Sequence, residues 1–521
     1  MANVPMCINT WALLLLHVCL HFVSLHGKVL RLPVHSSTQW VSEEVRAKGD
    51  MQVAPKDTLG GKPGLGFYVE IELGTPKQKL NVLLDTGSSN FAVAASPNKL
   101  ISRYFHINRS STYRDLDRKV YVPYTQGEWR GELGQDVASI PTSQPNVSVL
   151  VNVASITYSE EFFINESNWQ GILGLAYADI ARPDSTVEPF FDSLIERTNI
   201  DDVFTLQLCS FPENVSQTRR RQDMEVTGTM TIGGIDSSLY TGDIWYTDIR
   251  TDWYYEVIII DIEVGNQSLD MDCKEYNFDK TIVDSGTTNL RLPERVFGKL
   301  TQLINETLKM ELYDSAPDLF WTGDQFICKT TTDPWVWFPT LSIVLNGTEP
   351  DKGFRLRISP KQYLRQVQTD DPDAVCYKFG VSPSDTGSVI GAVVMEGFYV
   401  VFDRENQTVG FAESSCARKH EIPLSSPSIE GPIRIVAKDC GYIAPADNSK
   451  VLMIAAYIMV GLCALCLLPM LFLYVQYHCR RWLSDVRDSC DSSELLEERT
   501  DSSEIEALRE DVAQNQGEDK G

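Results

Sequence analysis

Residues 84–90, Leu-Asp-Thr-Gly-Ser-Ser-Asn, are the stretch that decides the fold of this 521-residue chain. The arrangement recurs 199 residues later as Val-Asp-Ser-Gly-Thr-Thr-Asn at 283–289. In each copy an apolar strand pattern leads into a turn of small residues that begins with an aspartate, Asp85 or Asp284. Two copies of one arrangement predict two similar lobes whose repeated aspartates meet at the interface between them.

The surroundings of the two copies also correspond. Each copy precedes an apolar-apolar-Gly run, at 172–174 in the first half and at 389–391 in the second. A third Asp-Thr-Gly at 385–387 follows a Pro-Ser pair instead of an apolar strand. We interpret this third copy as a turn in which Gly387 supplies a permissive φ angle. The alternative, that the other two copies are also simple turns, is disfavoured by their half-to-half correspondence.

Two facing carboxyl groups suggest a specific chemistry. At close range Asp85 and Asp284 cannot both ionise, so they share one proton as a pair. The flanking hydroxyl groups can hydrogen-bond the carboxylates and hold them coplanar. The charged member can take a proton from a water that attacks an amide carbonyl, and the protonated member can donate to the carbonyl oxygen. The pattern therefore predicts amide hydrolysis without a nucleophilic side chain, a metal or another cofactor.

Composition argues against several other classes of protein. The chain carries 71 Asp and Glu against 46 Lys and Arg, a formal charge of −25, which is unfavourable for binding nucleic acid. It has seven histidines, of which His35, His106 and His420 lie between residue 26, where we expect a signal peptide to end, and the apolar segment that begins at residue 451. His-Glu-x-x-His and Gly-x-Ser-x-Gly are both absent from the sequence. A histidine-dependent hydrolase is therefore disfavoured.

Secondary-structure signals indicate a protein dominated by β-strands with few helices. Short β-rich runs are separated by Gly, Pro and Asn. We expect strands at 66–73, 147–153 and 254–260, and helices at 188–197, 294–308 and 360–364.

Two apolar segments predict the topology. Residues 11–25 are short for a membrane span and suit the core of a signal peptide, the alternative being a buried helix that opens a domain. Residues 451–475 carry no charge and are long enough to cross a hydrocarbon layer of about 30 Å. We therefore expect a single-pass type I membrane protein with residues 27–450 on the luminal side. The expected domains are a signal peptide (1–26), a prosegment (27–58), an N-terminal lobe (59–240), a C-terminal lobe (241–440), a stalk (441–450), a transmembrane helix (451–475) and a disordered acidic cytosolic tail (476–521).

The luminal segment carries further signs of the secretory pathway. Six of its cysteines suggest three disulfides in an oxidising compartment, with 15 pairings allowed by spacing alone. Cys479 and Cys490 are either palmitoylated or plain thiols. The luminal cysteines are Cys209, Cys273, Cys328, Cys376, Cys416 and Cys440, and the glycosylation sequons are at Asn108, Asn146, Asn165, Asn214, Asn266, Asn305, Asn346 and Asn406.

A candidate flap lies after the first aspartate. Residues 121–129, Tyr-Val-Pro-Tyr-Thr-Gln-Gly-Glu-Trp, predict a hairpin with its tip near Gln126. Tyr124 and Trp129 are either flap side chains that cover the cleft or packing aromatics of the lobe.

The sequence resembles the pepsin family of aspartic proteases, and within it the membrane-anchored β-secretases (memapsins). The resemblance spans residues 60–442 and the membrane segment. It rests on the runs 84–93, 121–127, 171–178, 253–258, 271–276, 282–293 and 395–403. It implies a bilobal pepsin-like fold, an endopeptidase made as a zymogen, and passage through the Golgi, endosomes and the cell surface.

The resemblance also implies roles for individual residues. Asp85 and Asp284 would be catalytic, and an arginine in the cleft would favour polar or acidic substrate side chains. It implies the disulfides Cys209–Cys416, Cys273–Cys440 and Cys328–Cys376. The substrate-binding residues it implies are Gly87, Tyr124, Thr125, Gln126, Gly286, Thr287, Thr288 and Arg291, with Trp129 supporting the flap.

Two stretches depart from the family pattern. The segment Arg46-Ala47-Lys48 lacks the usual Arg-x-x-Arg of a convertase site, so the end of the prosegment is not defined by it. The basic loop 218–222 is either a surface loop, which we favour, or a processing site.

The tail carries a candidate sorting signal. Residues 491–496 fit an acidic dileucine formed by Asp491, Leu495 and Leu496, of the kind bound by cytosolic endocytic adaptors. A chance match in an acidic tail is the alternative.

We therefore expect an enzyme that cuts extended luminal segments of type I membrane proteins near the membrane, which is ectodomain shedding. A protease-like module that holds peptides without cutting them is one alternative, and a soluble lysosomal aspartic protease is the other. Both aspartates are present, which disfavours the first, and the uncharged segment 451–475 disfavours the second.

Overall fold

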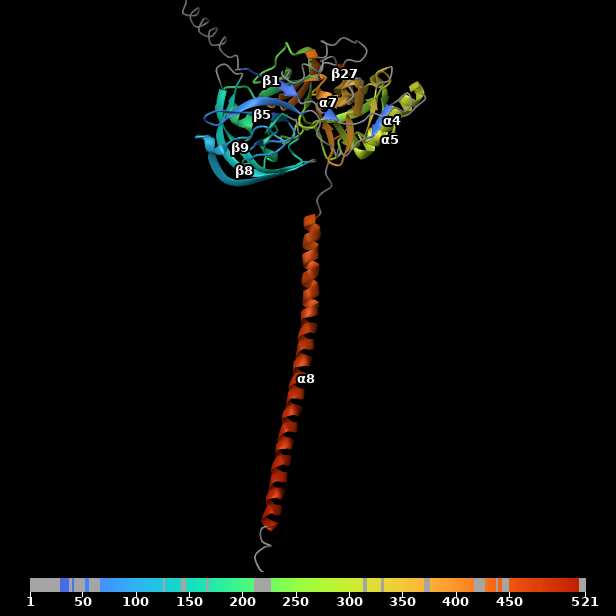
Figure 1. The fold of residues 1–521 in the computed structure, drawn as a ribbon. Helices are drawn as coiled ribbons and strands as arrows, with labels where there is room; N and C mark the ends of the chain where they lie inside the picture. Colours follow the sequence, from blue (N-terminus) through green and yellow to red (C-terminus); the bar gives the residue numbers. More distant parts are fainter. Residues whose placement is uncertain are drawn as a thin grey trace, which may run out of the picture. The chain divides into compact units, whose positions relative to one another are not determined.

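The computed structural model describes residues 29–36, 40–41, 52–55, 66–124, 127–141, 147–164, 168–209, 226–312, 316–328, 332–369, 375–416, 427–436, 439–442 and 449–514. The chain forms two compact units, Met1–Ile443 and Ala444–Gly521. The first unit is built mainly from β-strands with short helices (Figure 1), so the expected all-β-dominated class is confirmed.

A sheet of 13 strands runs through both halves of the first unit. Strands β11 and β25, far apart in sequence, pair antiparallel within it and join the two halves. In spatial order the strands are β13 (Tyr240–Asp248), β26 (Thr408–Ser414), β25 (Phe398–Asp403), β11 (Val203–Leu208), β12 (Val226–Ile232), β1 (Leu30–Ser36), β4 (Phe67–Leu73), β5 (Gln78–Asp85), β10 (Gly171–Gly174), β6 (Phe91–Ala94), β9 (Val147–Glu160), β8 (Glu128–Ile140) and β7 (Arg114–Pro123).

Three smaller sheets complete the β structure. The first is β15 (Gln267–Ser268), β14 (Ile259–Val264), β19 (Leu341–Asn346), β20 (Lys352–Ile358) and β27 (Ser428–Arg434). The second is β16 (Thr281–Val283), β24 (Ser388–Ile390), β17 (Leu290–Pro293) and β23 (Val381–Ser384). The third is β2 (Trp40–Val41), β21 (Leu364–Thr369), β22 (Cys376–Phe379), β18 (Gln325–Cys328) and β3 (Gln52–Pro55).

The helices of the first unit are short, apart from α4. The expected helices at 188–197, 294–308 and 360–364 are present as α2, α4 and α6. The described helices are η1 (Ile107–Arg109), η2 (Ala178–Ile180), α2 (Phe190–Arg197), α3 (Cys273–Tyr276), α4 (Glu294–Leu312), α5 (Asp318–Trp321), η3 (Pro334–Val336), α6 (Pro360–Tyr363) and α7 (Ala392–Met395).

The expected strand at 254–260 is mostly wrong, since β14 begins at Ile259. The preceding residues form a turn that is closed by the Arg250 N–H donating to the Glu256 carbonyl at 2.9 Å. Tyr255 is fully buried and its hydroxyl donates to the Leu175 carbonyl at 2.6 Å. The aromatic and β-branched residues that predict a strand here instead fill the space between the halves, because β propensity chiefly reports fit to a buried surface.

The internal repeat is visible in the strand pairing. In the first half β5 pairs parallel with β10, β10 antiparallel with β6, and β6 parallel with β9. In the second half β16 pairs parallel with β24, β24 antiparallel with β17, and β17 parallel with β23. The two aspartate-bearing strands β5 and β16 therefore occupy equivalent positions. The third Asp-Thr-Gly is a turn between β23 and β24 with φ of +99° at Gly387, as predicted.

A continuous apolar core supports these strands. Val82, Leu83 and Leu84 of β5 are all buried, because the strand is covered on both faces, as parallel-paired strands commonly are. The main cluster of buried side chains extends from Leu30 to Cys440 and includes both halves. The core thus fixes the ends of β5 and β16, where the aspartates lie.

Strand β1 falls inside the segment that we expect to be the prosegment, residues 27–58. It pairs with β12 from Leu30 to His35 and with β4 at His35 and Ser36. Part of that segment is therefore a strand of the 13-stranded sheet. The site at which it would be cleaved, and the lobe boundary at 240/241, stay predictions.

Three disulfides link the described cysteines of the first unit. They join Cys209 to Cys416, Cys273 to Cys440 and Cys328 to Cys376. These are the three pairs that the family resemblance implies. Among the sequons, Asn108, Asn266 and Asn406 are exposed, Asn305 and Asn346 are half-buried, and Asn146, Asn165 and Asn214 lie outside the described residues.

The second unit is the helix α8 (Ser449–Gln514). Within the described part of the chain, its segment Met453–Arg487 alone is long and apolar enough to cross a membrane, which fits a C-terminal anchor. The structure continues the helix to Gln514, which corrects the expected disorder of 476–521 over most of that range. The low apolar content of the tail means that it cannot form a packed core of its own. Helix formation does not require such a core, and residues 470–514 contain neither Gly nor Pro, the two residues least favourable in a helix. The dileucine residues Asp491, Leu495 and Leu496 lie on this helix.

Candidate active site

The two repeated turns meet inside the first unit. Asp85 is the last residue of β5, and Asp284 directly follows β16. Both are buried, with 4% and 8% of their surface exposed. The prediction that the halves of the chain bring these two aspartates together is therefore met by the structure.

Each carboxylate accepts the same pair of hydrogen bonds from its own turn. The Gly87 N–H donates to Asp85 Oδ1 at 2.9 Å, and the Gly286 N–H donates to Asp284 Oδ1 at 2.8 Å. The second oxygen of each accepts a hydroxyl hydrogen bond, from Ser88 at Asp85 and from Thr287 at Asp284, the latter at 2.7 Å. These bonds orient both carboxylates.

The glycines allow the carboxylates to approach the opposite turn. A Cβ added at Gly87 would lie 2.5 Å from Cγ of Asp284, and one added at Gly286 would lie 2.3 Å from Oδ1 of Asp85. Real Cβ atoms do not come so close to other heavy atoms. Each turn therefore needs glycine because the other turn's aspartate occupies the space beside it.

A symmetric hydrogen-bonded clasp fastens the two turns beneath the carboxylates. The Thr86 hydroxyl donates to the Val283 carbonyl at 2.9 Å, and the Ser285 hydroxyl donates to the Leu84 carbonyl at 2.9 Å. Each hydroxyl also accepts the other residue's N–H, at 2.9 Å for Ser285 N–H and 3.2 Å for Thr86 N–H. All four bonds connect strands that are about 200 residues apart in sequence. They therefore set the relative position of the two halves at the site.

The electrostatics of the pair favour a shared proton. Burial, and then the nearby charge of Asp284, raise the pKa of Asp85 from 3.8 to about 8. The hydrogen bonds from Ser88 and Gly87 oppose this rise because they stabilise the ionised form. At mildly acidic pH the pair therefore retains one proton and carries one negative charge.

The predicted hairpin at 121–129 is present between β7 and β8. The Tyr124 N–H donates to the Gly127 carbonyl at 3.0 Å, next to the tip. Trp129 is buried, and its indole N–H donates to the Tyr124 hydroxyl at 3.2 Å. Burial and then the charge of Asp85 raise the pKa of Tyr124, so this side chain lies within the electrostatic neighbourhood of Asp85. Thr125 and Gln126 lie outside the described residues.

Two further predicted cleft residues lie on the second half. Thr288 is half-buried, and its carbonyl accepts the Val393 N–H at 2.9 Å. Arg291 is half-buried on β17; burial lowers its pKa, and the charges of Asp385 and Asp284 oppose that shift. Arg291 therefore places a positive charge in the electrostatic neighbourhood of Asp284.

The bonds from Ser88 and Thr287 match the expectation that flanking hydroxyl groups hold the carboxylates. Two residues of this site were not singled out from the sequence, namely Thr86 and Ser285. Their signal was the repeat itself, since at an interval of 199 residues Thr86 corresponds to Ser285. Equivalent hydroxyl residues at equivalent positions indicate equivalent bonds. The clasp, however, crosses between the halves, so only the folded structure shows which carbonyls it reaches.

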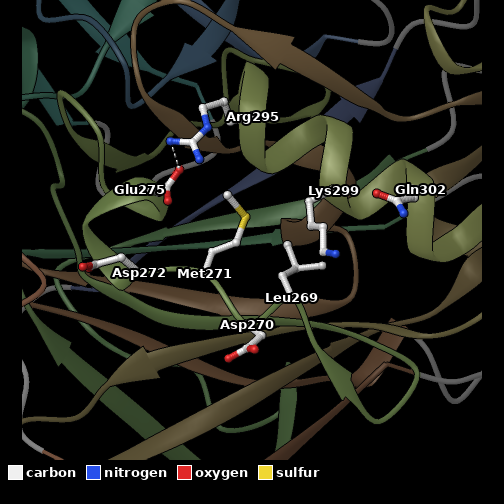
Figure 2. Close-up of a pocket in the computed structure, with 8 residues that line it drawn as sticks. All are labelled: Leu269, Asp270, Met271, Asp272, Glu275, Arg295, Lys299 and Gln302. Carbon is white, nitrogen blue, oxygen red and sulfur yellow. Dashed lines mark ion pairs between the residues drawn. The ribbon is translucent and has the colours of Figure 1, made fainter.

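The structure also has a surface pocket of about 530 Å³ away from the aspartate pair (Figure 2). Two of its charged side chains pair with each other, Arg295 with Glu275 at 2.8 Å, and a third, Asp272, accepts the Lys274 backbone N–H at the start of α3. We assign no ligand to it. Among the described residues no group of three or more His, Cys, Asp or Glu side chains could hold a metal ion. The pocket is lined by Leu269, Asp270, Met271, Asp272, Glu275, Arg295, Lys299 and Gln302.

Comparisons with known proteins agree with this geometry. The family model for eukaryotic aspartyl proteases matches residues 66–414. A β-secretase from Strongylocentrotus purpuratus is 51% identical over 433 residues, which cover 80% of this chain and 80% of the relative. Cathepsin D from Homo sapiens is 28% identical over 426 residues, covering 74% of this chain and 95% of the relative. Gastricsin from Oryctolagus cuniculus is 26% identical over 437 residues, which cover 77% of this chain and 99% of the relative.

Proposed function

Since this chain belongs to the eukaryotic aspartyl protease family and is a β-secretase-like peptide hydrolase, we propose that Asp85 and Asp284 are its catalytic pair. The observation that carries this proposal is the mutual contact of the two turns, in which each glycine borders the opposite carboxylate. Both carboxylates accept matching hydrogen bonds, which supports equivalent positions for them. The two groups then differ only in which one holds the shared proton.

The proposed reaction follows from one proton held by the pair. The ionised carboxylate accepts a proton from a bound water as the oxygen of that water attacks the peptide carbonyl carbon. The protonated carboxyl group donates to the carbonyl oxygen, which gives a neutral tetrahedral intermediate. The carboxyl group that took the proton of the water then protonates the amide nitrogen. The other carboxylate takes a proton from a hydroxyl group of the intermediate as the C–N bond breaks, so the products are a carboxylic acid and an amine and the pair again holds one proton. The clasp of Thr86 and Ser285 keeps both carboxyl groups in place through these transfers.

The flap and the second half would hold the substrate. We expect Tyr124 and Trp129 to support an extended peptide above the pair. The other residues expected to contact the peptide are Thr125, Gln126, Gly87, Gly286, Thr287 and Thr288. Arg291 would select polar or acidic side chains, because its half-buried guanidinium group places a positive charge in the electrostatic neighbourhood of Asp284. We therefore propose extended, acidic peptide segments as the preferred substrates.

The anchor restricts where this chemistry takes place. Helix α8 carries an apolar segment that fits a membrane span, and the three disulfides suit an oxidising lumen. We propose type I topology, action on luminal juxtamembrane segments of other membrane proteins, and traffic through the Golgi, endosomes and cell surface. The tail residues Asp491, Leu495 and Leu496 would bind endocytic adaptors.

An Asp284→Asn variant of the full-length protein tests the catalytic assignment. We expect loss of cleavage of an acidic peptide with peptide binding retained, because the amide cannot share the proton of the pair. Asp243→Asn is the matched control, since Asp243 is exposed on β13 and belongs to neither of the repeated turns. Unchanged cleavage by Asp284→Asn would contradict the catalytic assignment. If the protein is instead a peptide-binding module, the unaltered protein should bind the peptide without cutting it.

Carbonate extraction of membranes tests the anchor. An integral protein stays in the pellet, and a variant truncated before Ser449 is released. Recovery of the full-length protein in the extract would support the soluble alternative.

A further inference from the structure

An exposed ladder of side chains crosses the outer face of the flap hairpin. Tyr121 of β7 lies directly opposite Arg130 of β8, and Arg130 lies directly opposite Tyr158 of β9. The three side chains are thus in register across three neighbouring strands; β8 and β9 run side by side as long curved strands (Figure 1). Tyr121 and Tyr158 are 48% and 50% exposed, which is unusual for rings with packing roles alone.

Arg130 is clamped between the two rings. Its guanidinium carbon lies 5.1 Å from the ring centre of Tyr121 and 5.6 Å from that of Tyr158. Both distances are within the range of a cation–π interaction. A planar guanidinium group suits this position because it can stack on aromatic faces.

Glu128 and Glu160 fix the ladder further. Glu128 accepts the Tyr121 hydroxyl at 2.7 Å and an Arg130 N–H at 2.8 Å, so one carboxylate ties ring and cation together. Glu160 accepts the Tyr158 hydroxyl at 3.0 Å. All five side chains therefore take part in one connected network that spans β7, β8 and β9.

The other face of the same hairpin carries the flap residues. Trp129 precedes Arg130 and points inward, because neighbouring side chains of a strand alternate between faces. Its indole N–H donates to the Tyr124 hydroxyl, and the Tyr124 ring stacks on the Phe162 ring with 5.7 Å between the ring centroids. The ladder and the flap side chains therefore share one piece of backbone.

The ladder sits where the sheet bends. The register of β8 against β9 shifts between Arg130 and Gly131, which is a bulge, and bulges bend and twist a strand. A Cβ at Gly131 would lie 2.3 Å from the Ser155 carbonyl oxygen, so the backbones approach closely at this bend. Cross-strand contacts at such a point resist its opening.

We propose that Arg130, clamped between Tyr121 and Tyr158, is a positioning residue for peptide hydrolysis that stiffens the flap at its bend and holds Tyr124 over the aspartate pair. This inference rests on the proposed function of that pair. Arg130 itself touches no reacting atom and acts through the hairpin backbone. Its side chain is exposed, so its contribution concerns the flap and leaves the core untouched.

Hydrogen exchange of the full-length protein in detergent tests the stiffening directly. Two exposed cation–π contacts and one exposed ion pair together change a local opening equilibrium by about tenfold. Arg130→Ala should therefore speed exchange of the amides at 119–122 and 128–132 by about that factor, with β25 amides unchanged. Arg118→Ala is the matched control, since Arg118 lies on the same hairpin and pairs with Asp184 outside the ladder.

Peptide cleavage gives the second readout. Arg130→Ala should lower kcat/KM by about three- to tenfold, mainly through KM, because a looser flap is less often closed on the peptide. Arg130→Lys should recover part of the loss, as it keeps the charge but stacks less well. In a protein that already carries Tyr121→Leu and Tyr158→Leu, adding Arg130→Ala should change kcat/KM little, because the rings that hold Arg130 are gone.

Equal exchange rates in Arg130→Ala and the unaltered protein would overturn the inference, as would the same acceleration in Arg118→Ala. An unaltered protein that cleaves no peptide would instead refute the proposed function, while the exchange experiment would still report on the clamp.

Discussion

Replacing Thr86 by Ala tests the clasp between the two halves. Thr86 is fully buried, and its hydroxyl both donates to the Val283 carbonyl and accepts the Ser285 N–H, each at 2.9 Å. The change leaves two buried polar groups without these partners, at a cost of about 1–3 kcal/mol each. With the lost methyl group the free energy of unfolding should fall by about 3–6 kcal/mol.

The structure supplies two internal comparisons for this prediction. Thr86→Ser keeps the hydroxyl and loses one methyl group, so it should cost only about 1 kcal/mol. Ser285→Ala removes the equivalent bonds to Leu84 and Thr86, so it should cost nearly as much as Thr86→Ala. Because the clasp also positions the carboxyl groups, kcat should fall by about 100-fold in both alanine variants.

Chemical denaturation of the full-length protein in detergent, followed by tryptophan fluorescence, measures these stabilities. Peptide cleavage at one pH measures kcat. If Thr86→Ser lowered the free energy of unfolding as much as Thr86→Ala, the hydroxyl group would not be what stabilises the contact. Destabilisation of only one of the two alanine variants would likewise contradict a symmetric clasp.

Two further predictions concern the carboxyl groups. Gly286→Ala should reduce kcat by more than about 100-fold, because its Cβ would lie 2.3 Å from Asp85 Oδ1; Gly298→Ala on α4, where a Cβ meets nothing within 4 Å, is the control and should keep activity. Asp85→Asn should be stabilising, and increasingly so as pH rises. The raised pKa of Asp85 means that the folded state holds a proton which the unfolded state releases above 3.8, so stability is lost between that pH and about 8. Thermal unfolding of both proteins should show a gap that widens to the order of 3 kcal/mol over this range, and a constant gap would contradict the assignment.

The sequence predicted the parts of the site that depend on local pattern. The repeated Asp-Thr/Ser-Gly turns, the hairpin at 121–129 and the helix at 294–308 all follow from short-range signals, and the structure contains each of them. The repeat was the strongest of these signals, because two equivalent strands imply two equivalent aspartate positions.

The parts that depend on long-range contact were less accessible. The clasp joins Thr86 to Ser285, and no local pattern states which carbonyl each hydroxyl reaches. Spacing left 15 disulfide pairings open, because a covalent link between distant cysteines follows from the fold. The strand expected at 254–260 became a turn because Tyr255 is buried between the halves and bonds to Leu175.

The pH dependence of kcat/KM for an acidic peptide tests whether Asp85 and Asp284 catalyse hydrolysis by sharing one proton. We expect a bell-shaped profile, in which activity falls at low pH as both carboxyl groups are protonated and at high pH as the shared proton is lost. We also expect Asp85→Asn and Asp284→Asn to have no measurable activity at any pH. A profile that stays flat from below 3.8 to above 8, or one that persists in either variant, would contradict the claim.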